Sequence, residues 1–432
     1  MGISLLDNRN FLLHWGSLAI AQTGSFFTLV ALPWMVLSMT DNDPFIMATV
    51  MATISLCQGF FILFGGALAD RFSPIKLLFL SRLMFCVVMA SLAVFVYLSK
   101  IPLWLIYIYA FVLGTLGAFG IPASQSLLPA IVDKSELGKA NGIVMGTVQL
   151  TQIIGPVAAG WLIWFVRSFT DAPSAQADYH GFAVAFLVDA IAILLAVVLL
   201  SIMKVAIGPK AKGNLFTMVT QGVVFCWKDR GIRLVLAYLI LISFFLHGPL
   251  LTALPLIIKV ELGLSEGAYG TLYAMIGIGT VIGAGIAALT TPSPKALGAV
   301  VLSCDLISGA CLYLLGKIGG VWTTGGTLLI MGICSGIIMI AGITWFQNRT
   351  PDVYMGRVMS ILMFCILGLI PISASLAGFL IGVTSISLVI IGAGIAIMVV
   401  SGVGLLIPRI RNMGDTPISV GYELGLVEAS HT

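Results

Sequence analysis

Charged side chains are scarce in this chain. Asp, Glu, Lys and Arg make up 9% of its 432 residues, whereas a soluble domain averages about 25%. No basic arm and no basic-aromatic surface pattern is present, so nothing indicates a nucleic-acid partner. The shortage of charge and of long polar stretches excludes an ordinary soluble domain and indicates a protein solvated largely by lipid.

Sequence signals of chemistry are also missing. No CxxC pair or Cys/His metal spacing occurs, and no Walker loop, HExxH segment or supported Ser/His/Asp set stands out. We therefore predict no enzyme activity, no catalytic residues, no cofactor and no metal site. The cysteines are Cys57, Cys86, Cys226, Cys304, Cys311, Cys334 and Cys365. All except Cys226 fall in apolar runs, where we interpret them as packing residues.

Apolar residues are abundant instead, at 59% of the chain. A membrane span needs about 20 mainly apolar residues, and helices satisfy the backbone in lipid. Twelve runs qualify, and the first is too long for the apolar core of a signal peptide. They cover residues 11–39, 44–69, 76–98, 102–131, 141–167, 181–203, 233–258, 267–290, 296–316, 322–347, 358–382 and 385–408. The predicted fold is an all-α membrane protein with twelve transmembrane helices in two six-helix halves.

Basic residues are distributed unequally between the two sides that these spans define. One side holds only Lys100, Arg167, Lys259 and Lys317, and the remaining Lys and Arg of the 21 lie on the other side. Cytoplasmic loops carry the excess of Lys and Arg. The sequence therefore predicts that both termini are cytoplasmic, and we expect the protein in the cytoplasmic (inner) membrane.

The chain divides into two similar halves. We predict an N-terminal half (1–203), a cytoplasmic linker (204–232), a C-terminal half (233–408) and a flexible tail (409–432). A shift of 218 residues aligns Ala159-Gly160-Trp161-Leu162-Ile163 with Ala377-Gly378-Phe379-Leu380-Ile381 and carries other glycines and prolines with it. Parallel repeats of this kind are a transporter architecture. The many glycines fit close helix packing, and Gly142 and Gly146 form one such pair.

Two motifs carry a resemblance to a known family. The loop Gly66-Ala-Leu-Ala-Asp70-Arg71-Phe-Ser-Pro-Ile-Lys76 resembles the cytoplasmic signature loop of the major facilitator superfamily. Gly155-Pro156-Val-Ala-Ala-Gly160 is similar to the glycine-proline motif of that family's antiporters. Three further segments resemble the drug and siderophore exporter branch, which includes macrolide and enterobactin exporters. They begin at Ala31, Leu128 and Pro351.

The resemblance implies an alternating-access carrier. Its halves would rock about a cavity lined mainly by spans one, four, seven and ten, and spans three, six, nine and twelve would be peripheral. The two motifs supply the expected gating residues, with a solvated turn as the alternative interpretation of the first. They are Gly66, Asp70, Arg71, Lys76, Gly155, Pro156 and Gly160. One departure concerns the proton site: Gly24 is followed by Ser25, where the branch often carries an acid.

Polar residues within the spans are candidates for substrate binding, because amides and hydroxyls at membrane depth need partners. The candidates are Gln22, Ser25, Gln58, Gln125, Gln152, His247, Trp345 and Gln347. For each amide alone, a hydrogen bond that links two helices is the favoured interpretation, whereas their concentration on the expected cavity spans favours substrate binding by the set. His247 also changes charge near neutral pH, so it is a candidate for proton coupling, with a neutral hydrogen-bonded histidine as the alternative.

Two acids lie within apolar runs, Asp189 in span six and Asp305 in span nine. Burying either one in the charged state is costly. Because these spans are expected at the periphery, structural pairing is the favoured interpretation. Both acids remain candidates for proton coupling, since Ser25 replaces the usual acid.

The predicted function is secondary active export of amphipathic or hydrophobic small molecules by proton antiport. We expect a monomer whose partners are the substrate, the proton and the lipid bilayer. Alternatives within transport are a lysophospholipid flippase and a siderophore exporter. Outside transport, the alternative is a membrane sensor or scaffold, which would be favoured if Gln22, Gln152 and His247 were all inaccessible.

Overall fold

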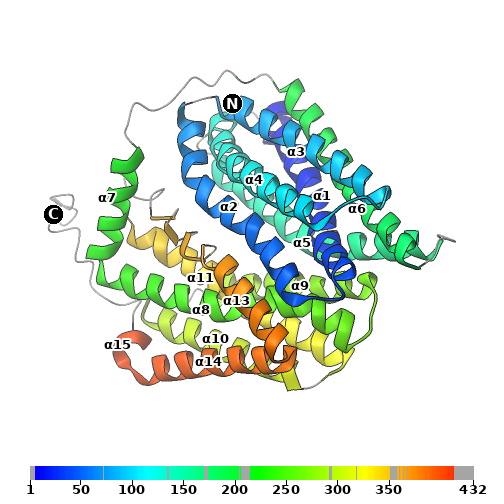
Figure 1. Cartoon of the computed structure of the whole chain (residues 1–432). Coiled ribbons are helices and arrows are strands. Elements are labelled where there is room, and N and C mark those ends of the chain that lie inside the picture. Colours follow the sequence, from blue (N-terminus) through cyan, green and yellow to red (C-terminus); the bar gives the residue numbers. More distant parts are fainter. Residues whose placement is uncertain are drawn as a thin grey trace. The chain divides into compact units, whose positions relative to one another are not determined.

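The computed structural model has helices as its only regular secondary structure in the residues that it describes (Figure 1). These are residues 5–71, 73–133, 136–169, 174–203, 205, 215–290, 294–317, 319–350, 358–359, 361–362, 364–366 and 368–412. The helices are η1 (Leu5–Asp7), α1 (Arg9–Met39), α2 (Pro44–Arg71), α3 (Pro74–Tyr97), α4 (Leu103–Ile131), α5 (Leu137–Ser168), α6 (Ser174–Ile202), α7 (Leu215–Lys228), α8 (Arg230–Leu256), η2 (Ile257–Glu261), α9 (Glu266–Thr290), α10 (Pro294–Lys317), α11 (Val321–Arg349), α13 (Ile370–Val383), α14 (Ile386–Leu406) and α15 (Pro408–Arg411).

Twelve helical segments of the described chain are long and apolar enough to cross a membrane. Each corresponds to one run of the sequence analysis, so the prediction of an all-α membrane protein with twelve spans is confirmed. Span seven is longer than expected, because the π-helix η2 extends α8 to Glu261. Span eleven covers Phe364–Val383 and contains α13.

The described chain forms two compact units. The first comprises Met1–Lys212 together with Thr252–Gly277. In it, α1 packs against α5 and α6, α2 packs against α4, and α3 lies between α4 and α6. Small apolar residues such as Ala21 and Ala196 are buried where α1 meets α6. The segment Thr252–Gly277 comes from the start of the second predicted half, yet it packs in the same unit as the N-terminal helices.

The second unit comprises Gly213–Leu251 and Ile278–Thr432. Within it, α10 packs against both α11 and α14. The unit also contains α7, which lies inside the segment 204–232 that the sequence analysis treats only as a linker. At 14 residues, α7 is too short to span a membrane, which is why a search for long apolar runs passes over it.

Close helix contacts occur at other glycines than the pair that the sequence suggested. A Cβ atom added at Gly142 or Gly146 would meet nothing within 4 Å in the described structure. At Gly279 and Gly283 of α9, by contrast, it would lie 2.2 and 2.0 Å from backbone oxygens of α11. Among the described residues Gly142 and Gly146 face open space, so their interpretation as a packing pair stays a prediction.

Candidate transport site

Four of the predicted substrate-binding residues are exposed, and each lies on a different span. Ser25 is on α1 and Gln125 on α4, while His247 is on α8 and Gln347 on α11. These helices are spans one, four, seven and ten, which the resemblance implies for the cavity. A polar side chain on a membrane span avoids the lipid tails. The four residues therefore indicate a polar surface on each of these helices.

The other predicted substrate residues are less accessible. Gln22, Gln58 and Gln152 are half-buried on α1, α2 and α5. Trp345 is 7% exposed, and its ring lies 5.2 Å from the guanidinium carbon of Arg349. Trp345 is thus part of a packed cluster in this structure.

Asp189 is fully buried on α6 and contacts α1. Its Oδ2 accepts a hydrogen bond of 2.5 Å from Thr28 Oγ1. Its Oδ1 is buried without a hydrogen-bond partner among the described residues. A Cβ atom at Gly24 would lie 2.7 Å from this Oδ1, so the free oxygen faces the backbone of α1 one residue before Ser25. Pairing to a hydroxyl satisfies only one oxygen of this carboxyl group.

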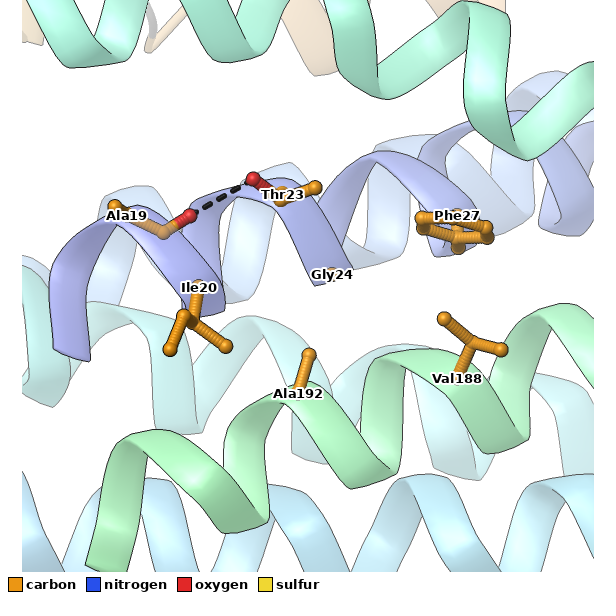
Figure 2. A pocket seen from close by; sticks show the side chains of 7 residues that line it. All are labelled: Ala19, Ile20, Thr23, Gly24, Phe27, Val188 and Ala192. Carbon is orange, nitrogen blue, oxygen red and sulfur yellow. Dashed lines mark hydrogen bonds between the residues drawn. The ribbon is translucent and has the colours of Figure 1, made fainter. Parts of the chain in front are cut away.

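A pocket of about 270 Å³ lies beside the contact between α1 and α6. In Figure 2, Ala19, Ile20 and Phe27 of α1 and Val188 and Ala192 of α6 surround it. Gly24 of α1 also lines it. The hydroxyl of Thr23 donates to the carbonyl of Ala19 and is already satisfied. The lining is therefore apolar and suits a hydrocarbon group more than an ion.

Asp305 has a fuller set of partners in the second unit. It is 2% exposed on α10, and its Oδ2 accepts a 2.7 Å hydrogen bond from the hydroxyl of Tyr238 on α8. The same hydroxyl lies 3.0 Å from Ser401 Oγ of α14. In each half, then, a buried acid is bonded to a hydroxyl of that half's first span. Sequence reasoning predicted pairing but did not identify Thr28 or Tyr238.

The glycine-proline motif packs α5 closely against α9 in the first unit. A Cβ atom at Gly160 would lie 2.2 Å from the carbonyl oxygen of Glu266, and one at Gly270 would lie 2.0 Å from that of Pro156. Gly155 faces α1 instead, 2.5 Å from the ring of Phe26 by the same measure. The motif thus allows two backbones to approach more closely than any side chain would permit.

The first unit also contains polar contacts that the sequence analysis did not predict. Arg167 Nη1 lies 3.3 Å from Glu266 Oε1, and Glu266 is only 2% exposed. In the π-helix η2, Lys259 donates to Ser38 Oγ at 2.8 Å. The Lys259 ammonium also lies 5.5 Å above the ring of Trp34. π-Helical turns are frequent at functional sites. Arg167 and Lys259, two of the four basic residues assigned to the outer side, therefore bind side chains of neighbouring helices.

The signature loop is described only in part. The backbone of Gly66, Asp70 and Arg71 continues α2, but their side chains lie outside the described residues. Lys76 is exposed near the start of α3. The gating role of these residues stays a prediction.

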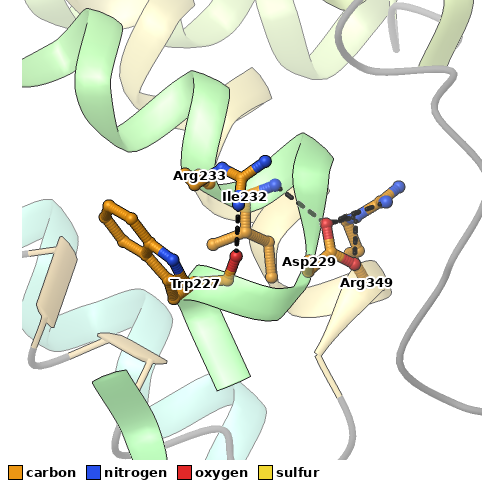
Figure 3. Close-up of polar contacts among 5 residues, drawn as sticks. All are labelled: Trp227, Asp229, Ile232, Arg233 and Arg349. Carbon is orange, nitrogen blue, oxygen red and sulfur yellow. Dashed lines mark hydrogen bonds and ion pairs between the residues drawn. The ribbon is translucent and has the colours of Figure 1, made fainter. Parts of the chain in front are cut away.

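An ion pair in the second unit was also missed. Arg349 at the end of α11 contacts Asp229, which precedes α8 (Figure 3). Asp229 is 0% exposed, and its Oδ1 also accepts from the backbone amide of Ile232 at 2.9 Å.

In the first unit, a capping residue links α1 to α4. Asn8 caps α1 and donates to the carbonyl of Ile131 at 2.8 Å. Asp and Asn directly before a helix are cap signals, and that pattern would have identified both residues.

Two curated proteins are similar to this chain over most of its length. A staphyloferrin A transporter from Staphylococcus aureus (strain NCTC 8325 / PS 47) is 27% identical over 368 residues, which cover 82% of this chain and 85% of that protein. An enterobactin exporter, EntS, from Salmonella choleraesuis (strain SC-B67) is 26% identical over 303 residues, or 68% and 67% of the two chains.

Solved structures share the fold at low sequence identity. A POT family transporter crystallised with 5-aminolevulinic acid superposes with a TM-score of 0.73 at 12% identity, covering 93% of this chain and 97% of that one. A D-xylose-proton symporter gives a TM-score of 0.65 at 12% identity, with coverages of 91% and 97%. These likenesses concern the fold alone.

The family itself is shown by a family model. The model described as Major Facilitator Superfamily matches residues 15–367, which is most of the chain. The resemblance of the chain to the major facilitator superfamily is thereby confirmed. With twelve apolar helices in its described residues, this integral membrane protein is a transporter, not an enzyme, and belongs to the Major Facilitator Superfamily.

Proposed function

We propose that this protein is a secondary active exporter of amphipathic or hydrophobic small molecules that works by alternating access and proton antiport. The observation that carries the proposal is the set of exposed polar residues on the four expected cavity spans, namely Ser25, Gln125, His247 and Gln347. They supply hydrogen-bonding groups of little charge, which suit a neutral or weakly charged solute. We place the protein in a bacterial inner membrane with both termini on the cytoplasmic side, and we expect a monomer.

The exposure of His247 also argues against the sensor or scaffold alternative. That alternative expected Gln22, Gln152 and His247 to be inaccessible together. His247 is exposed midway along span seven, and the two glutamines are half-buried. Polar groups remain available to a solute.

Among the acids, we propose Asp189 as the stronger candidate for carrying the coupling proton. One of its oxygens lacks a hydrogen-bond partner among the described residues, so a proton has an open acceptor there. Asp305 is held by Tyr238, which is itself bonded to Ser401. His247 remains a second candidate, because an exposed imidazole exchanges protons near neutral pH.

For gating, we propose that the contact between α5 and α9 is one that breaks and reforms during transport. Gly155, Pro156 and Gly160 provide the close approach, and the Arg167–Glu266 pair adds charge at its edge. On the other side of the membrane, we retain Gly66, Asp70, Arg71 and Lys76 as gating residues on the strength of the family motif.

Siderophore export is the second candidate function. Its support is that the relatives described above are named an enterobactin exporter and a staphyloferrin A transporter.

Transport by purified protein in liposomes tests the proposal. An imposed pH gradient is applied, and the movement of a lipophilic cationic dye, a macrolide, a lysophospholipid and a tris-catechol chelator is followed. We expect gradient-driven movement of the dye or the macrolide. Movement of the chelator alone would establish the siderophore alternative, and movement of the lysophospholipid alone would establish a flippase. No movement of any probe by folded protein would overturn the proposal.

Two variants separate the proton candidates. Asp189→Asn preserves shape and the hydrogen bond from Thr28 but removes the titrating group, and Asp305→Asn is its matched control. We expect the first variant to lose gradient-driven transport while it still exchanges substrate down a concentration gradient. Equal coupling in wild type and Asp189→Asn would remove Asp189 from the proton path.

A further inference from the structure

The short helix α7 presents an apolar face to its surroundings. Val223 and Val224 are 47% and 48% exposed, and Trp227 is 69% exposed. Together with exposed Thr220, they recur at the i, i+3, i+4 and i+7 spacing of one helix face. The opposite face is covered, since Phe225 is 3% and Cys226 5% exposed. A helix on a water-facing surface would expose mainly polar and charged residues on this face instead.

The position of α7 relative to the membrane follows from its neighbour in the chain. Only Asp229 separates α7 from α8, which is a membrane span. At this junction α7 runs across the direction of α8 (Figure 1). Asp229 is anchored by Arg349 and by the amide of Ile232. The end of α7 is thereby held at the level where the span begins.

Basic residues surround the exposed indole. Lys228 and Arg230 are exposed on either side of Asp229. Arg233 lies with its guanidinium carbon 5.5 Å from the Trp227 ring and donates to the Trp227 carbonyl at 2.9 Å (Figure 3). Tryptophan is enriched at membrane interfaces, and basic residues beside an apolar helix face attract anionic lipids.

From these observations we propose that α7 lies in the membrane surface, with Val223, Val224 and Trp227 among the acyl chains and with Lys228 and Arg230 bound to anionic phospholipid headgroups. This inference is independent of the proposed substrate and of proton coupling. A lipid surface is favoured over a protein partner because the exposed face is apolar at the level of a span and the exposed charges that flank it, on Lys228 and Arg230, are both positive.

Quenching of tryptophan fluorescence by brominated lipids tests the proposal. Full-length protein is reconstituted in equal amounts of phosphatidylglycerol and phosphatidylethanolamine, with bromine on the acyl chains of only one of them. The difference between wild type and Trp227→Phe isolates the quenching of Trp227. We expect the quenching of Trp227 to be at least about twofold larger with brominated phosphatidylglycerol than with brominated phosphatidylethanolamine. The reason is that each basic residue near the surface enriches anionic lipid by up to about fivefold.

The Lys228→Gln/Arg230→Gln variant is expected to make the two brominated lipids equally effective at Trp227. Trp322, 93% exposed at the start of α11, is the control. The quenching of Trp322 is the difference between proteins with and without the Trp322→Phe substitution. We expect this difference to be the same with and without the two charge substitutions. If Trp227→Phe changes quenching by neither lipid, α7 does not lie in the bilayer. Equal quenching by both lipids in the presence of Lys228 and Arg230 would overturn the recognition of anionic headgroups.

Discussion

Arg349 and Asp229 form a buried ion pair with more than one hydrogen bond. Arg349 Nε lies 3.0 and 3.2 Å from the two carboxylate oxygens of Asp229, and Nη2 lies 3.0 Å from Oδ1. The side chains are 6% and 0% exposed. The pair joins the end of α11 to the start of α8, so two spans that are distant in sequence are connected through one residue each.

Removing one partner of this pair is expected to destabilise the protein strongly. Asp229→Asn or Arg349→Gln leaves a buried charge without its partner, which costs about 3–5 kcal/mol. The double variant leaves no unpaired charge and is expected to be more stable than either single variant. Unfolding in detergent, followed by circular dichroism, measures these differences.

The matched control for that experiment is the pair of Lys139 and Glu136. It has a similar distance of 3.0 Å, but the Lys139 side chain is 72% exposed. Lys139→Gln is therefore expected to change stability by less than about 1 kcal/mol. Equal effects of Arg349→Gln and Lys139→Gln would show that burial does not strengthen the Asp229 pair.

The close contact of α5 with α9 predicts a specific sensitivity to one methyl group. In Gly270→Ala, the new Cβ would lie 2.0 Å from the Pro156 carbonyl oxygen, so the helices must separate. We expect a loss of about 1–3 kcal/mol, measured as a lower unfolding temperature. Gly285→Ala on the same helix meets nothing within 4 Å and is expected to be neutral or slightly stabilising. The prediction fails if both variants behave alike.

The proposed proton role of His247 predicts a change in pH dependence. His247→Gln keeps a hydrogen-bonding side chain but removes the titratable imidazole. We expect transport by the variant to vary less with pH than transport by the wild type, at unchanged expression. Ser243→Ala, one turn earlier and 3% exposed, is expected to keep the wild-type pH profile. A wild-type profile in His247→Gln would exclude the proton role.

The covered face of α7 predicts an inert thiol at Cys226. Burial, more than the nearby Cys365 and Asp229, raises the pKa of this thiol to about 12. The thiolate is the reactive form, so alkylation by N-ethylmaleimide is expected to remain slow until the pH approaches that value. The stability that comes from burying the neutral thiol is complete below pH 9 and is lost as the pH rises from 9 to about 12.

A cysteine at an exposed, charged position of α7 provides the comparison. Lys228→Cys, at the exposed end of α7, is expected to react readily at pH 8 in detergent solution. Peptide mass spectrometry reports each cysteine separately. Rapid labelling of Cys226 at pH 8 would show that α7 does not keep this face covered.

The sequence by itself determined the class of fold and the family. Twelve apolar runs are enough to specify twelve spans, because lipid offers backbone groups no partners and every run must satisfy them as a helix. The motifs at Gly66 and Gly155 identified the superfamily, since their spacing is local and can be read without coordinates. The polar residues Ser25, Gln125, His247 and Gln347 were likewise found as polar positions in apolar runs.

Only the tertiary structure decided which of these residues are accessible and what holds them. Gln22 and Ser25 lie on one helix, yet Gln22 is half-buried and Ser25 exposed, because exposure depends on neighbouring helices that the local sequence does not specify. The partners of Asp189 and Asp229 lie 161 and 120 positions away, in Thr28 and Arg349. Gly142 and Gly270 look alike in the sequence, but among the described residues only Gly270 has the backbone of another helix close to it. Periodicity determines a helix, whereas pairing between distant helices depends on how their surfaces meet in three dimensions.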